Sequence, residues 1–125
     1  MSGIVQHLES ELSRCGIDRF EEISWDTTLY PHYTKKHAKD VPVVTEFCER
    51  LQKVVGRVLN EGDFPLVFGG DHSCAVGTWS GISKVCADRG QEKPGVLWID
   101  AHLDSHTFET SPSWALHGMP LACLL

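Results

Sequence analysis

The segment WIDAHLDSH, residues 98–106, decides the fold and raises the first question about function. Its apolar beginning is typical of a buried strand, and Asp100, His102 and Asp104 follow where that strand is expected to end. Residues two apart on an extended backbone point to the same side, so these three side chains are predicted to converge. A solvent-exposed loop does not need this spacing, which therefore points to a functional site.

A second polar cluster follows a second apolar run. The segment DFPLVFGGDHS, residues 63–73, predicts a buried strand that ends in a tight glycine turn just before His72. Residues 71–90 then predict a helix that begins near Ser73 and is weakened by Gly77 and Gly81. Strand, helix and strand form a β-α-β unit, which predicts an α/β fold with a mainly parallel sheet. Such sheets bind ligands beyond the carboxyl ends of their strands, so both polar clusters are expected to share one crevice.

The first half of the chain predicts two helices. Apolar residues recur at helical spacing before Gly16, where the first helix is expected to stop. The second helix is predicted to begin after Asp40 as N-cap, with Pro42 in its first turn, and to run through residues 43–62. Residues 21–27 predict a short strand and residues 30–40 a loop. The buried stripe of the second helix is predicted to be Val44, Phe47, Leu51, Val54, Val55 and Val58.

Composition restricts the class of protein. A chain of 125 residues with 42% hydrophobic residues is long enough for one modest domain. The formal net charge of -6 argues against nucleic acid or an anionic membrane as the main partner. No apolar run approaches the roughly 18 residues of a membrane span, and the N-terminus lacks the pattern of a signal peptide. Five widely spaced cysteines without a CxxC pair fit a reducing, cytoplasmic compartment.

The two polar clusters together predict a metal site. His72, Asp100, His102 and Asp104 offer two imidazoles and two carboxylates without a thiolate, a set that favours an ion such as Mn²⁺ over structural zinc. Asp100 has two oxygens and can bridge two ions, which can hold a hydroxide nucleophile at neutral pH. A single histidine after a glycine turn is more often a hydrogen-bonding residue, so the prediction depends on both clusters occurring together.

Three blocks resemble the signature blocks of the arginase/agmatinase (ureohydrolase) family, most closely those of the arginase branch. They are GGDHS (residues 69–73), DAHLD (residues 100–104) and LHGMP (residues 116–120), and the resemblance extends from about Phe64 to Leu125. It implies a three-layer α/β/α fold in which residues 1–125 form the N-terminal portion of a single domain. It also implies a cytoplasmic enzyme that acts on a small guanidino compound and forms a homo-oligomer when full length.

The resemblance also implies roles for individual residues. His72, Asp100 and Asp104 would hold one Mn²⁺, His102 and the bridging Asp100 a second, and His117 would shuttle protons. The reaction would be hydrolysis of L-arginine to L-ornithine and urea by a metal-bridging hydroxide. The chemistry agrees, because a guanidinium carbon is a poor electrophile and its amine leaves only after protonation, which an imidazole can supply.

The chain departs from the family pattern where the substrate's amino acid end would bind. His106 and Ala115 stand at positions where the family carries asparagine, and Trp114 stands where a small residue is usual. His106 and Ser113 remain the candidate substrate-binding residues. The identity of the guanidino substrate is therefore less constrained than the type of reaction.

The second departure concerns the end of the chain. The family's later S-x-D-x-D block has no counterpart within residues 1–125, which end in LACLL, expected to start a buried helix. The chain is therefore expected to be a fragment or a truncated product that binds metal weakly on its own.

Other functions stay open at this stage. An agmatinase or another guanidino-acid ureohydrolase would use the same blocks, and a relative of the single-zinc deacetylases shares the arginase-like fold. A truncated, non-catalytic product would bind a partner through an unfinished sheet edge. Trp79 and Trp98 are predicted to be core residues, and Cys74 a small packing residue.

Overall fold

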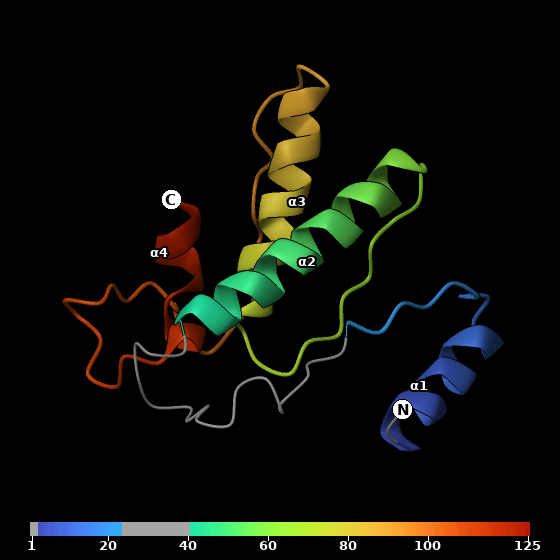
Figure 1. Cartoon of the computed structure of the whole chain (residues 1–125), viewed down its shortest axis with the longest axis horizontal. Coiled ribbons are helices and arrows are strands. Elements are labelled where there is room, and N and C mark those ends of the chain that lie inside the picture. The colour runs from blue at the N-terminus through green and yellow to red at the C-terminus, as the bar shows by residue number, and fades with distance from the viewer. Residues whose placement is uncertain (1–2, 24–40) are drawn as a thin grey trace.

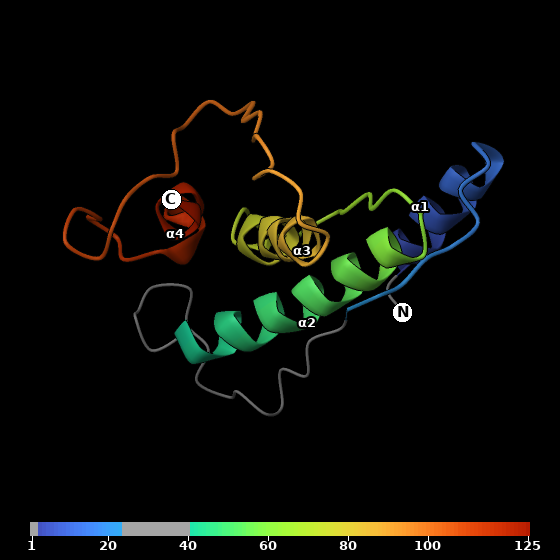
Figure 2. The same ribbon diagram turned by 90° about the horizontal axis from the view of Figure 1, so that it is seen from above.

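The computed structural model of the chain describes residues 3–23 and 41–125. Its elements are α1 (Gly3–Arg14), α2 (Val41–Asn60), α3 (Cys74–Asp88), the short 3-10 helix η3 (Leu116–Gly118) and α4 (Pro120–Leu124). In Figures 1 and 2, α2 and α3 form the centre of the molecule, and α4 packs beside α3. The three long helices and the helix at LACLL were predicted from the sequence. The expected N-cap Asp40, the loop over residues 30–40 and residues 24–27 of the expected first strand lie outside the described residues.

The three long helices end in the same way. After α1, Gly16 has φ +82°, its amide donates to the carbonyl of Ser13, and the amide of Ile17 donates to the carbonyl of Leu12. This is a Schellman motif, in which a residue in the left-handed conformation satisfies the last helical carbonyls. Gly62 after α2 and Gly90 after α3 close their helices by the same two bonds. The stop expected at Gly16 is confirmed.

Helices α2 and α3 pack through two glycines of α3. A Cβ atom on Gly77 would lie 2.7 Å from the carbonyl oxygen of Cys48, and one on Gly81 would lie 2.8 Å from that of Gln52. Both distances are too short for a real side chain, so only glycine permits this approach of the two backbones. These glycines were expected to weaken the helix, whereas in the structure they allow α3 to pack closely against α2.

The core between these helices is small. Of the predicted α2 stripe, Leu51 and Val55 are buried, whereas the other four members are half-buried. Val43 and Cys48 on α2 complete the buried face of that helix. The stripe was therefore placed on the correct face, shifted slightly around the helix axis. Ala75, Val85, Met119 and Pro120 are further buried apolar residues of the described ranges.

The predicted strands over residues 63–70 and 94–100 are not formed, and no strand occurs in the described ranges. A strand is defined by hydrogen bonds to a neighbouring strand, and no backbone bond joins these two segments within the part of the chain that the structure describes. Residues 21–23 likewise form no strand. The apolar side chains expected in a sheet core are instead exposed: Phe64 by 87%, Leu97 by 82% and Ile99 by 87%. The prediction of buried strands is therefore wrong for this structure.

The segment that follows α1 is held to the end of α2 by ion pairs. Arg19 pairs with Glu61 and Asp63, and Glu21 pairs with Arg57. These side chains are well exposed, so each pair contributes little stability, although together they fix where the segment runs. None of the helices in the described ranges has the length and apolar character required to cross a bilayer.

Candidate metal centre

The first half of the site is the turn that leads into α3. Asp71 Oδ1 accepts hydrogen bonds from the backbone amide of Ser73, at 2.9 Å, and from its hydroxyl. The carbonyl of Asp71 accepts a further bond from the amide of Cys74 at 3.4 Å. Because Asp71 closes this turn with its own side chain, the neighbouring His72 is held at a fixed place before α3. The helix start expected near Ser73 is confirmed, with Ser73 as the N-cap residue.

The second half of the site is the DAHLD turn. Asp100 Oδ1 accepts a hydrogen bond from the backbone amide of His102 at 2.8 Å. Asp104 has φ 48°, a left-handed conformation that aspartate tolerates better than most residues, and its carbonyl accepts the amide of Leu121 at 2.9 Å. The beginning of the turn is thus held by the bond between Asp100 and His102, and its end by the bond to Leu121 of α4. Asp100, His102 and Asp104 were predicted to follow one another on an extended backbone, but in the structure they lie on a turn.

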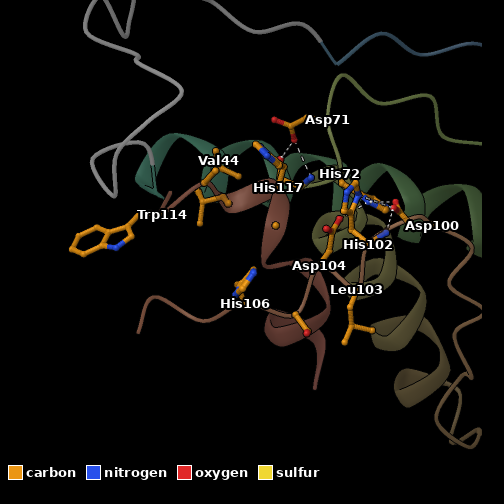
Figure 3. A pocket seen from close by; sticks show the side chains of 15 residues that line it. Val44, Asp71, His72, Asp100, His102, Leu103, Asp104, His106, Trp114 and His117 are labelled. Atoms are coloured by element: carbon orange, nitrogen blue, oxygen red, sulfur yellow. Dashed lines mark hydrogen bonds and ion pairs between the residues drawn. The ribbon is translucent and has the colours of Figure 1, made fainter. Parts of the chain in front are cut away.

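The two turns bring one imidazole and two carboxylates together. His72 Nδ1 lies 3.0 Å from Asp100 Oδ2 and 2.7 Å from Asp104 Oδ2, as Figure 3 shows. One ligand atom from each residue lies within 4.8 Å of the others. The donors are one nitrogen and two oxygens, a set that suits a divalent ion of hard or borderline character. The sequence predicted that His72 would join Asp100, His102 and Asp104, and the structure brings His72 together with the two aspartates but leaves His102 outside this group.

His102 is less well placed than the other three predicted ligands. Its Nδ1 lies 3.5 Å from Asp100 Oδ1, and its side chain is 82% exposed. It does not belong to the compact group formed by His72, Asp100 and Asp104. Asp100 nevertheless presents Oδ2 to His72 and Oδ1 to His102, so its two oxygens face two different imidazoles.

The carboxyl of Asp100 favours its charged form. The hydrogen bond from the amide of His102 is the largest effect and lowers the pKa of Asp100. Desolvation opposes it, and the nearby imidazoles of His72 and His102 add smaller lowering effects. An ionised carboxylate is the form that ligates a metal ion. The turn geometry therefore keeps Asp100 in its ligating state.

A pocket of about 720 Å³ contains this group. His106, Trp114 and His117 line the pocket together with the metal-site residues, whereas Ser113 does not line it. His117 is exposed on η3, and the amide of His106 donates to the carbonyl of Gly118 at 3.1 Å. The described residues of the lining include three aspartates and no lysine or arginine, so the pocket is suited to a cation.

Two residues in this region have roles that were not predicted from the sequence. Asp71 closes the turn before α3, and an aspartate two residues before the N-cap of a helix is a recognisable turn signal. Trp98, predicted as core, stacks on His72 with ring centroids 4.4 Å apart and planes 18° from parallel. Its position two residues before Asp100 was the available signal, because alternate residues of an extended segment face the same side.

With this geometry in view, comparison with known proteins defines the class. The model of the arginase family matches residues 7–125, and the chain belongs to the arginase family. The arginase of Bacillus caldovelox is 48% identical over 87 residues, covering 70% of this chain and 27% of that protein. The arginase of Brevibacillus brevis is 39% identical over 125 residues, covering 99% of this chain and 39% of that protein.

Solved structures agree with this assignment. The crystal structure of arginase from Bacillus subtilis has a TM-score of 0.72 at 38% identity, covering 94% of this chain and 36% of that chain. The structure of Bacillus caldovelox arginase has a TM-score of 0.66 at 36% identity, covering 90% and 37%. The chain thus shares the α/β fold family of these enzymes and spans between 27% and 39% of the length of the arginases compared here.

Proposed function

We propose that this chain carries part of the active site of a manganese-dependent hydrolase that cleaves L-arginine to L-ornithine and urea. The observation that supports the proposal best is that His72, Asp100 and Asp104 lie together near the N-terminus of α3. Membership of the arginase family, whose compared members are named arginases, supports the reaction. We also propose the three-layer α/β/α fold, a cytoplasmic location and a homo-oligomer for the full-length form.

The donor set fits the ions that the family implies. His72, Asp100 and Asp104 would hold one Mn²⁺, and His102 with the second oxygen of Asp100 would hold another. Divalent ions in such a site supply the charge that makes water a nucleophile at neutral pH. Asp71, Asp100 and Asp104 also give the pocket a negative field that attracts a guanidinium cation.

Two histidines have separate roles in this proposal. His117 lines the pocket and is also exposed to solvent, so its imidazole can carry a proton from water to the departing amine. His106 lines the same pocket and would contact the far end of the substrate, with Ser113 as a second candidate. The Ser113 hydroxyl accepts the amide of Ala115 at 3.4 Å, which leaves its proton available for a ligand.

One observation favours a second substrate. No lysine or arginine occurs among the described residues that line the pocket. Agmatine has the guanidino group without an α-carboxylate and needs no cationic partner at that end, and an enzyme that prefers it would be an agmatinase. Both substrates require the same metal site.

Urea release in the presence of Mn²⁺ tests both candidates. The chain is assayed with L-arginine and with agmatine, and the preferred substrate distinguishes the arginase from the agmatinase reading. His72→Ala is expected to abolish urea release, whereas His7→Ala, an exposed histidine on α1, serves as the matched control. Full activity of the His72 variant would refute the proposed site.

A further inference from the structure

Trp98 is joined to the candidate metal centre through His72. The indole and imidazole rings stack with centroids 4.4 Å apart and an interplanar angle of 18°. On its edge, the same imidazole presents Nδ1 to both Asp100 and Asp104. One face of the His72 ring is thus covered by an aromatic surface while its nitrogen faces the carboxylates.

The backbone around Trp98 directs this side chain alone toward the protein. Its neighbours Leu97 and Ile99 are 82% and 87% exposed, whereas Trp98 is half-buried and its Nε1 atom is fully buried. Successive residues of an extended segment face opposite sides, so Trp98 and Asp100, two positions apart, share the side on which His72 lies. The indole reaches His72 from the same segment that supplies the next ligand.

The indole N–H of Trp98 makes no hydrogen bond that could help to hold His72. Trp98 Nε1 has no hydrogen-bond partner, although it is buried. A buried donor without a partner is unfavourable, so a tryptophan here is not retained for its hydrogen bond. What the side chain supplies is its flat face against the imidazole.

We propose that Trp98 is a positioning residue for metal binding: its indole holds the His72 ring in the plane that aims Nδ1 at Asp100 and Asp104. An exposed imidazole rotates freely about its Cβ–Cγ bond, and fixing it in advance removes an ordering cost from metal binding. This inference rests on the proposed metal site, and it concerns a residue that lies outside both the candidate ligand group and the pocket lining.

Two variants of Trp98 separate stacking from volume. Trp98→Phe keeps an aromatic face and removes the unpaired N–H, so Mn²⁺ affinity is expected to stay within about threefold of the parent. Trp98→Leu keeps apolar bulk without a flat face, and affinity is expected to fall about tenfold, the lower range for residues that orient a metal ligand. Free Mn²⁺ is measured by electron paramagnetic resonance during titration of the whole chain, with folding checked by circular dichroism. Trp79→Leu on α3 makes the same substitution outside the pocket and is expected to bind Mn²⁺ as the parent does.

A second measurement needs no metal. The order parameter of the His72 ring, from ¹³Cε1 relaxation of the metal-free chain, is expected to fall in Trp98→Leu and to be restored in Trp98→Phe. Failure of the parent to bind Mn²⁺ would overturn the proposed function, and the ring measurement would then still decide whether Trp98 holds His72. The positioning role would be overturned if the order parameter of the His72 ring in Trp98→Leu matched that of the parent. It would also be overturned if Trp98→Leu bound Mn²⁺ as tightly as the parent, or if Trp98→Phe lost as much affinity as Trp98→Leu.

Discussion

His72 Nδ1 lies 2.7 Å from Asp104 Oδ2, although the two residues come from separate turns on either side of helix α3. Asp71 fixes the first turn through the amide of Ser73, and the amide of Leu121 fixes the second through the carbonyl of Asp104. Each half of the site is therefore held by a hydrogen bond from a backbone amide, accepted by the Asp71 side chain in the first turn and by the Asp104 carbonyl in the second. Its residues can be tested one at a time because these supports do not depend on the ligand side chains of His72 and Asp104.

Asp100→Asn is expected to weaken Mn²⁺ binding by at least about 100-fold. Loss of a residue that only orients a ligand already costs about 10–100-fold, and Asp100 offers both of its oxygens to the site. Isothermal titration with Mn²⁺ measures the change. Asp88→Asn, an exposed aspartate on α3 that pairs with Lys84, is the matched control. Equal affinity of the Asp100 variant and the parent would contradict the assignment.

His117→Asn is expected to lower urea release about 100-fold while leaving Mn²⁺ affinity unchanged. His117 lines the pocket and is exposed, but it does not belong to the group that His72 forms with the two aspartates. Removal of a general acid or base commonly costs 10²–10⁴-fold in rate. Initial rates with saturating substrate, measured beside Mn²⁺ titrations, separate the two effects. Loss of metal affinity in this variant would argue for a ligand role instead.

Gly81→Ala is expected to destabilise the fold by about 1–3 kcal/mol, because its new methyl group would overlap the Gln52 carbonyl of α2. Gly56→Ala is the matched change on α2. A Cβ atom there would meet only Val85 Cγ2, at 3.8 Å, so the better helix former should raise stability by about 0.5–1 kcal/mol. Urea denaturation of both variants gives the free energies of unfolding. Similar values for the two variants would contradict the close approach of α2 and α3.

The pKa of Glu61 is lowered from its ordinary value of 4.5, first by the hydrogen bond that Arg19 donates to it. A lowered pKa in the folded chain stabilises the fold above the ordinary value, and this contribution is lost as the pH falls through the folded value. In Arg19→Gln the pKa of Glu61 should return toward 4.5. Titration of the Glu61 ¹³Cδ resonance measures it, with Arg14→Gln, whose partner is Glu11, as the control. An unshifted Glu61 in the Arg19 variant would rule out this ion pair in solution.

Trp114 has φ 57°, a left-handed conformation in which its amide donates to Ser111 Oγ at 2.9 Å. A side chain in this region costs about 1–2 kcal/mol, which glycine avoids. Trp114→Gly should therefore be about 1 kcal/mol more stable than Trp114→Ala, since both lose the indole and only alanine keeps the strained Cβ. Thermal unfolding of the pair measures the difference. Equal stability would place residue 114 in an ordinary conformation.

The meeting of His72 with Asp100 and Asp104 could be predicted from the sequence because two short polar clusters each follow an apolar run. Asp100 and Asp104 were expected to converge as alternate residues of a strand, whereas in the structure a turn and a left-handed Asp104 bring them together. The glycine stop after α1 was equally predictable, because a single residue in the left-handed conformation carries the Schellman motif. Such features depend on a few neighbouring residues, so the sequence alone indicates them.

Whether the apolar runs form strands could not be decided from neighbouring residues in the same way. A run such as PLVF indicates a strand only if a neighbouring strand supplies hydrogen bonds, and that pairing is a property of distant segments. The stacking of Trp98 on His72 was missed for a similar reason, because it joins two segments that α3 separates in the sequence. Ser113 was expected in the substrate site because it lies between the DAHLD and LHGMP blocks, although the structure leaves it outside the pocket lining.

The loop that carries His106, Trp114 and His117 is closed at its base by two backbone bonds, from His106 to Gly118 and from Leu121 to Asp104. Neither bond involves a side chain, so the residues between these anchors can change without moving Asp104. The loop is therefore a modular unit of the fold: exchange of its residues is expected to change the lining of the pocket while the candidate ligand Asp104 keeps its place.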